Sequence, residues 1–146
     1  MLGRQNAYGH RMNISRLTTP QRISAVSILV VALAAFLPWV SIFGIGVSGI
    51  EGDGVITLAL SSAGGIVLAV TTGLFGQPKV AGKKSPISLL VMSVLVALIG
   101  LMDMNGAAAI GLYLTLFGGV AWVVGAAWQL SAYKQDAAPV MEESVP

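Results

Sequence analysis

The chain has 146 residues, contains no cysteine, and has charged side chains at only 10% of its positions. The lack of cysteine excludes disulfides, thiolate metal sites and thiol redox catalysis. The single histidine, His10, lies among basic residues and has no neighbouring side chains that would complete a metal or catalytic site. Apolar residues make up 55% of the chain, which is typical of an integral membrane protein.

Four apolar runs predict four helices. We expect them over Ile23 to about Val40, Val55 to Phe75, Pro86 to Met102 and Ala107 to Leu130. The third run, with roughly 17 residues, reaches the lower limit for crossing a hydrocarbon core of about 30 Å. The predicted fold class is therefore all-α, an integral membrane four-helix bundle. Residues 23–130 form the transmembrane domain, between a basic tail (1–22) and a polar tail (131–146).

The alternative interpretation of the first apolar run is a cleaved signal peptide of a secreted protein. Arginines precede this run, and Ala32-Leu33-Ala34 resembles a cleavage site. Apolar sequence continues past these alanines, which favours an uncleaved first span.

The connections carry helix-start signals. Thr18 and Pro20 suit the start of the first helix, Asp53 is expected to cap the second, and Ser85 the third. Between Ser41 and Gly54, closely spaced glycines alternate with apolar side chains. Because each glycine lowers helix stability by roughly 1 kcal/mol relative to alanine, this segment is expected to follow an extended or turning path at the outer membrane interface.

All the basic residues fall in alternate connections of this topology. Basic residues keep short flanking segments in the cytoplasm, so both termini and the middle loop are predicted to be cytoplasmic, in the plasma membrane. The same logic explains the basic pI without a nucleic-acid partner. The cations are Arg4, Arg11, Arg16 and Arg22 before the first helix, Lys79, Lys83 and Lys84 between the second and third, and Lys134 after the fourth.

Small residues recur at four-residue spacing in the second and fourth helices. Such stripes let neighbouring membrane helices approach closely. The predicted helix-packing residues are Ser61, Gly65, Ala69 and Gly73 in the second helix, and Gly111, Thr115, Gly119, Ala121 and Gly125 in the fourth.

Aromatic side chains mark the expected membrane boundaries. Trp39 and Tyr113 are predicted anchors at the outer interface, and Trp128 and Tyr133 at the inner interface, because amphipathic rings favour the headgroup level. Trp122 lies deeper and is expected to pack against protein or lipid.

The predicted spans contain no Asp, Glu, Lys, Arg or His. Proton-coupled transporters and pumps use ionisable groups within the membrane, and membrane haem proteins use histidine ligands. These classes are therefore disfavoured, and neither a catalytic residue nor a cofactor is predicted.

Two sets of residues admit a second interpretation. Glu51, Asp53 and Asp103 are all expected on the outer side and could form a cation site, but a helix cap, a turn and a solvated side chain explain them more simply. The stretch Ser61 to Gly65 could be a broken helix lining a substrate path, yet close helix packing is the favoured interpretation.

Leu37-Pro38-Trp39, followed by Ser48 to Gly54 and then Val55-Ile56-Thr57-Leu58, resembles a loosely defined group of small, uncharacterised multi-span proteins of actinobacteria. The resemblance covers about twenty residues. The resemblance implies that the chain shares a lineage with these proteins. It provides no catalytic residues that could be assigned to positions of this chain.

The function expected from the sequence is that of a non-catalytic accessory or structural subunit. Its expected partners are membrane lipids and other subunits of a larger respiratory or cell-envelope complex. The alternative is a small oligomeric channel or uncharged-solute transporter lined by the glycine-serine stretch of the second helix. A third hypothesis is a signalling modulator that senses through its outer glycine-rich loop.

Overall fold

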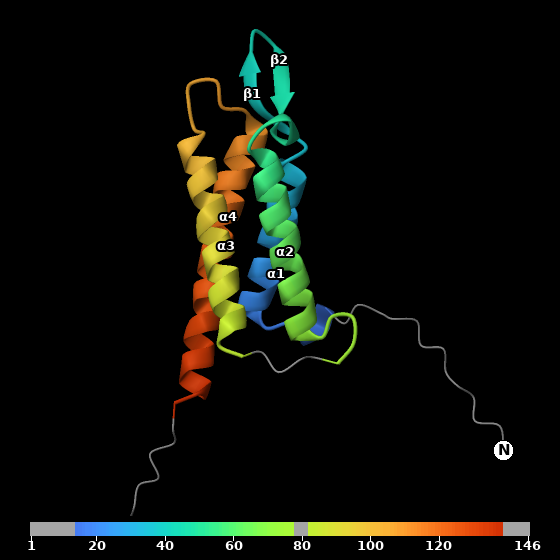
Figure 1. Ribbon diagram of the computed structural model, residues 1–146, viewed down its shortest axis with the longest axis vertical. Helices are drawn as coiled ribbons and strands as arrows, with labels where there is room; N and C mark the ends of the chain where they lie inside the picture. Colours follow the sequence, from blue (N-terminus) through green and yellow to red (C-terminus); the bar gives the residue numbers. More distant parts are fainter. Residues whose placement is uncertain (1–13, 78–81, 139–146) are drawn as a thin grey trace, which may run out of the picture.

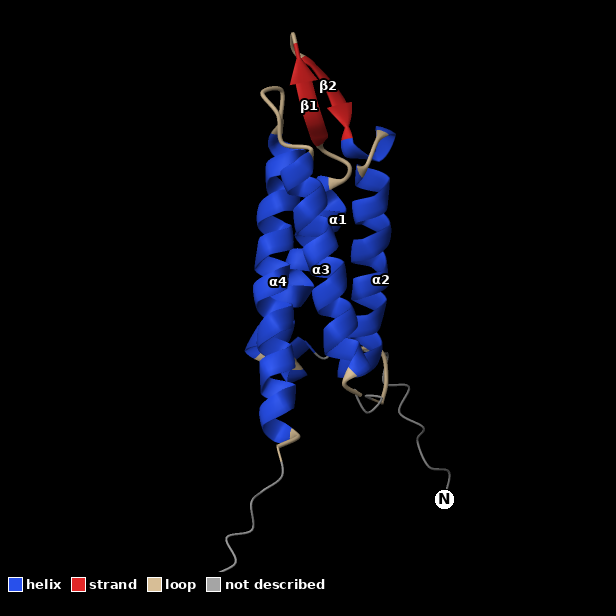
Figure 2. Cartoon of the chain, turned by 60° about the vertical axis from the view of Figure 1, so that its left-hand side comes forward, coloured by secondary structure: helices blue, strands red, loops and turns tan. Residues whose placement is uncertain are grey.

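The computed structural model describes residues 14–77 and 82–138 (Figure 1). Within these ranges the chain forms four α-helices, side by side, and a β-hairpin at one end of the bundle (Figure 2). In chain order the elements are η1 (Ile14–Arg16), α1 (Thr19–Ala34), β1 (Pro38–Ile42), β2 (Ile45–Ser48), η2 (Gly49–Glu51), α2 (Gly54–Thr72), α3 (Lys84–Met102) and α4 (Ile110–Asp136).

Three helices of the described part, α2, α3 and α4, are long and apolar enough to span a membrane. The remaining helix, α1, is apolar but has only 16 residues. The expectation of a mostly helical fold is therefore confirmed, with a small antiparallel sheet in addition.

The first helix is shorter than predicted. It ends at Ala34, and the expected helical residues up to Val40 instead form a turn and most of β1. Pro38 explains this end, because proline has no N–H to donate and disfavours helical geometry at Leu37 before it. At its start, the Thr18 N–H donates to Gln21 Oε1 at 2.9 Å, which satisfies a backbone group at the helix terminus.

The other helix boundaries shift by a few residues. Helix α2 stops at Thr72 because Gly73 adopts a left-handed conformation, with φ of 68°, and caps the helix. Asp53 occupies the N-cap position of α2, but its side chain makes no capping hydrogen bond. Lys83, not Ser85, is at the cap position of α3. Helix α4 continues six residues past the predicted end at Leu130, to Asp136.

Helix α4 lies at the centre of the packing, with its most extensive contacts to α1 and α3. Glycines make these contacts possible. A Cβ on Gly119 would lie 2.9 Å from the backbone nitrogen of Ala97 in α3, and one on Gly125 would lie 2.6 Å from Ser24 Oγ in α1. Such distances are shorter than van der Waals contact, so the helices could not approach this closely with larger residues.

The core combines large apolar side chains with small hydroxyl residues. Trp122 is fully buried in the middle of it. The buried hydroxyls of Thr57, Ser61, Ser93 and Thr115 each donate to a carbonyl of their own helix, at 2.8–3.0 Å. Each therefore satisfies its hydrogen-bonding need without a partner from another helix.

Candidate functional site

The β-hairpin projects beyond the ends of the helices (Figure 1). Its strands pair in the antiparallel sense, with Ile42 opposite Ile45 and the two residues Phe43 and Gly44 between them. Both turn residues have positive φ, 51° at Phe43 and 80° at Gly44. This combination is that of a type I′ turn, whose twist matches the twist of the strands and favours glycine at its second position.

The hairpin exposes apolar side chains and carries no charge. We define the hairpin tip as Ile42, Phe43, Ile45 and Val47, whose exposed fractions are 54%, 102%, 74% and 43%. No residue from Pro38 to Gly49 is charged. The tip is therefore an uncharged apolar surface that contacts little of its own chain.

The base of the hairpin is held firmly to the bundle. The connection between α3 and α4 pairs with β1, because Ser41 N–H donates to the Ala107 carbonyl at 2.9 Å and Ala109 N–H donates to the Trp39 carbonyl at 2.7 Å. On the other side, Ile50 N–H donates to the Ala35 carbonyl at the end of α1, at 2.9 Å. These bonds fix the direction in which the tip points.

Trp39 packs at the centre of this base. Expected at the outer interface as an anchor, it is instead 5% exposed, and its indole N–H donates to the Ala34 carbonyl at 3.0 Å. The strand register shifts between Pro38 and Val40, so Trp39 lies at a bulge. A bulge turns a side chain away from its normal alternation, which directs this ring into the protein.

Two glycines make room for the Trp39 ring. A Cβ on Gly49 would overlap its pyrrole edge, and a Cβ on Gly111 would lie 2.8 Å from its Cδ1 atom. Gly49 belongs to η2 and Gly111 to the first turn of α4. The ring thus joins the end of α1, the hairpin base and the start of α4.

A cavity of about 310 Å³ lies beside the hairpin base. Its lining includes Trp39, Asn105 and the three carboxylates Glu51, Asp53 and Asp103. Within the described residues, no three acidic, histidine or cysteine side chains are close enough together to hold a metal ion. The three carboxylates therefore form part of the cavity wall.

The pKa of the Asp103 carboxyl is raised, first because partial burial removes water from it and second because the negative charge of Asp53 is nearby. The Asn105 amide holds the loop around it, donating to the Asp103 carbonyl at 3.0 Å and accepting from the Ala107 N–H at 2.9 Å. Asp103 is thus fixed in a position where its charged form is disfavoured.

Replacement of Asp103 by asparagine is expected to raise the melting temperature at neutral pH. The raised pKa means that the folded protein binds this proton more tightly than the unfolded chain, so stability rises as pH falls through the raised pKa. The advantage of Asp103→Asn should therefore shrink on acidification. Thermal unfolding followed by circular dichroism in detergent, at several pH values, measures the difference in melting temperature between the variant and the wild type.

The control for this prediction is Asp136→Asn, on an exposed residue at the opposite end of the bundle. It should leave the pH dependence unchanged, whereas Asp53→Asn should reduce it by removing the neighbouring charge. A pH-independent effect of Asp103→Asn would contradict the assignment.

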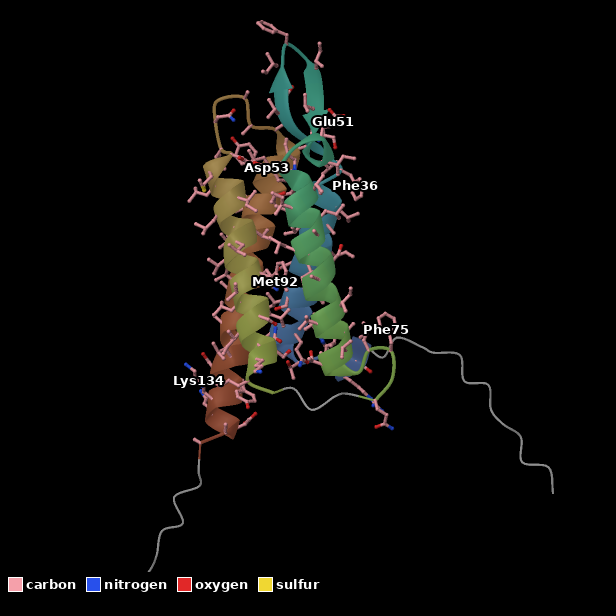
Figure 3. The ribbon with its side chains drawn as sticks, viewed as in Figure 1. Phe36, Glu51, Asp53, Phe75, Met92 and Lys134 are labelled. Atoms are coloured by element: carbon pink, nitrogen blue, oxygen red, sulfur yellow. The ribbon has the colours of Figure 1, made fainter. Side chains whose placement is uncertain are left out.

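The two ends of the bundle carry opposite charge. Glu51 and Asp53 lie at the hairpin end and Lys134 at the other (Figure 3). The starts of α1 and α3 also lie at the second end, and with them the cations Arg22 and Lys84. Arg4, His10, Arg11 and Lys79 lie outside the described residues.

The small residues predicted for α4 lie at helix contacts. Gly111, Thr115, Gly119 and Gly125 are buried, and Ala121 is half-buried. Gly111 faces the hairpin base and Thr115 lies in the core. Gly119 faces α3, and Gly125 faces α1.

The arrangement on α2 differs from the predicted stripe. Its buried side consists of Gly54, Thr57, Ser61, Gly64 and Leu68. Of the predicted residues, Ser61 is fully buried, Gly65 and Ala69 are half-buried, and Gly73 lies beyond the helix end.

The closest approach on α2 is at Gly64, where an added Cβ would overlap the Trp122 ring. Trp122 therefore packs against protein, and its indole N–H has no hydrogen-bond partner within the described residues. The ring contacts α2 at Gly64, and α2 continues as one unbroken helix through Ser61 to Gly65.

The remaining predicted anchors lie on α4. Tyr113 and Trp128 are 42% and 52% exposed, and Tyr133 is half-buried. Tyr113 lies near the hairpin end of the helix, and Trp128 and Tyr133 lie toward the basic end.

Comparison of the chain with protein-family models, with curated proteins and with solved structures finds no match.

Proposed function

We propose that the protein is a non-catalytic subunit of a larger membrane complex, embedded as a four-helix bundle. The distribution of side chains supports embedding. The outward faces of the helices carry large apolar residues, including Leu29 at 63%, Ile66 at 66% and Phe117 at 66% exposure. Several hydroxyl residues are buried inside the bundle instead, namely Ser24, Ser27, Thr57, Ser61, Ser93 and Thr115. In water this surface would be an aggregation hazard, whereas lipid accommodates it.

The difference in charge between the two ends of the bundle supports an orientation with both termini in the cytoplasm. Basic residues are retained on the cytoplasmic side of the plasma membrane, and Arg22, Lys84 and Lys134 share one end of the bundle. In this orientation the acidic cavity and the hairpin are outside. Helix α1 crosses together with its neighbours, because it packs antiparallel to α2 along the same axis.

The hairpin tip is the observation that carries the proposed subunit role. It is an apolar surface on a rigid support, held away from the bundle by the bonds at its base. Lipid-facing residues explain the sides of the helices, but the tip lies beyond the helix ends. An uncharged apolar surface presented in this way is suited to a pocket on a partner protein.

Polar substitution of the tip is expected to release the partner without affecting folding. Phe43→Ser with Ile45→Ser removes two side chains that are 102% and 74% exposed, so the melting temperature should change little. Loss of such central apolar anchors costs about 2 kcal/mol or more in binding, roughly a 30-fold loss of affinity. Quantitative mass spectrometry of proteins co-purified from native membranes in mild detergent measures the release.

The matched control is Phe75→Ser, an exposed phenylalanine at the opposite end of the molecule (Figure 3). It should retain the same partner at the same stoichiometry. If both variants retain the partner equally, the hairpin is not the docking element. If the wild-type chain brings down no stoichiometric partner and conducts solute as a homo-oligomer, the channel alternative takes its place.

A further inference from the structure

A groove of about 230 Å³ runs between α1 and α2 near the basic end of the bundle. Side chains of both helices form its walls, and the residues after α2 close one end. Its lining is Leu17, Ala25, Ile28, Leu29, Gly65 and Leu68, continued by Ala69, Thr72, Leu74 and Phe75. Thr72 is the only hydroxyl residue in this lining, and its hydroxyl donates to the Leu68 carbonyl at 2.7 Å. The surface offered to an occupant is therefore apolar throughout.

The groove exists because α2 presents small residues here. Gly65 and Ala69 are one turn apart, and a Cβ on Gly65 would still be 3.5 Å from Ile28 Cγ2, an ordinary contact. The two helices are therefore not pressed together at this level. From Gly65 to Thr72 the groove extends roughly 10 Å along the helix axis, about a third of a hydrocarbon core.

A positive charge stands at the basic end of the groove. Arg22 precedes Ala25 by three residues and Leu29 by seven, so all three lie on the same face of α1. The Arg22 Nε–H donates at 3.1 Å to the carbonyl of Leu17, which itself lines the groove. This bond, made through Nε, holds the guanidinium beside the mouth of the groove. The N-terminal end of α1 adds a partial positive charge.

We propose that this groove binds an acyl chain of an anionic phospholipid, with the lipid phosphate beside Arg22. A flexible chain of methylenes fits a short, irregular apolar groove, whereas a partner helix needs a contact face several turns long. The guanidinium matches the phosphate in charge and in hydrogen-bonding geometry. The proposal rests on membrane insertion, and it is independent of the docking role of the hairpin.

Native mass spectrometry tests the proposal on the full chain released from bilayers of palmitoyl-oleoyl phosphatidylcholine that contain phosphatidylglycerol of the same chains. The wild-type protein is expected to retain phosphatidylglycerol in preference to phosphatidylcholine. Gly65→Leu fills the groove and should remove the retained lipid. Arg22→Gln should lower the preference for phosphatidylglycerol roughly fivefold, as expected for one basic side chain near an anionic lipid.

Two controls distinguish a specific lipid-binding site from general electrostatic attraction of anionic lipid to basic residues. Ser62→Leu adds the same side chain at an exposed position of α2 outside the groove, and Lys134→Gln removes a different charge from the same end. Both should retain lipid as the wild type does. Equal losses with Arg22→Gln and Lys134→Gln would overturn the proposal.

Other occupants give different results. A wild-type dimer that Gly65→Leu converts to a monomer would assign the groove to a second copy of the chain. A wild-type protein that retains no phosphatidylglycerol would also refute lipid binding. Neither result bears on partner capture by the hairpin, so the two proposals can fail separately.

Discussion

Replacement of Gly64 by leucine is expected to prevent α2 from packing on the bundle. Any Cβ at this position would overlap the Cζ2 and Cη2 atoms of Trp122. The ring cannot move aside, because it is fully buried among Val31, Leu89 and Val96. Overpacking of this kind costs about 1–3 kcal/mol for small insertions, and leucine adds far more volume than alanine. Loss of helicity on titration with dodecyl sulfate measures the change in stability.

Gly65 provides a matched comparison one residue away. A Cβ on Gly65 meets only Ile28 Cγ2 at 3.5 Å, so Gly65→Ala should be neutral or should stabilise the helix by up to about 1 kcal/mol. Gly64→Ala should destabilise in the same assay. Trp122→Phe should relieve part of the cost of Gly64→Ala, because the smaller ring leaves room for the methyl group. Equal stability of the two alanine variants would contradict the packing argument.

Replacement of Trp39 by alanine is expected to destabilise the hairpin end by roughly 3–5 kcal/mol, the usual cost of removing a large buried ring. The side chain joins α1, η2 and α4, and the Ala34 carbonyl would lose the indole donor while it keeps the Leu37 N–H at 3.1 Å. Trp39→Phe keeps most of the ring volume and removes the donor, so its cost should fall to about 1–3 kcal/mol. Denaturant titration followed by helicity measures both effects.

Trp128→Ala is the control for this result. Trp128 is 52% exposed on α4, so its removal should change stability much less than the removal of Trp39. A Trp39→Ala variant as stable as Trp128→Ala would show that the hairpin base is not held by this ring. Loss of the partner in Trp39→Ala, with Phe43 and Ile45 intact, would indicate that the tip must be held rigidly in order to bind.

The sequence predicts the helices well because apolar runs are long and their periodic pattern is simple. The structure agrees on helices in four places and moves their ends by a few residues. The largest difference is at Pro38, where a proline in the apolar run was a boundary signal that hydropathy alone does not weigh. The apolar run places Pro38 to Val40, the first part of the hairpin, in the first helix, and only the segment from Ser41 onward is predicted to be non-helical. The only hairpin signal in this segment is Gly44 between β-branched residues, because Phe43 is an unusual residue for the first position of a type I′ turn.

The side-chain details depend on tertiary packing and were less accessible. Four-residue spacing selects Gly65 as a contact residue, but the rotation of α2 in the bundle places Gly64 against Trp122 instead. Composition alone does not distinguish Gly64 from Gly65 as the contact residue, because the two glycines are adjacent in the chain. The position of the Trp39 side chain also depends on tertiary packing. A tryptophan after an apolar run fits a headgroup anchor, and only the bulge and the two nearby glycines show that it turns inward.

The short length of α1 has a consequence for the membrane around the protein. At 16 residues this helix is about 24 Å long, several ångströms less than a typical hydrocarbon core, whereas the 27 residues of α4 reach about 40 Å. An inserted bundle therefore has one low side and one tall side. Lipids beside α1 must compress to match it, so the protein should favour thinner bilayers and should tilt toward that side in thicker ones.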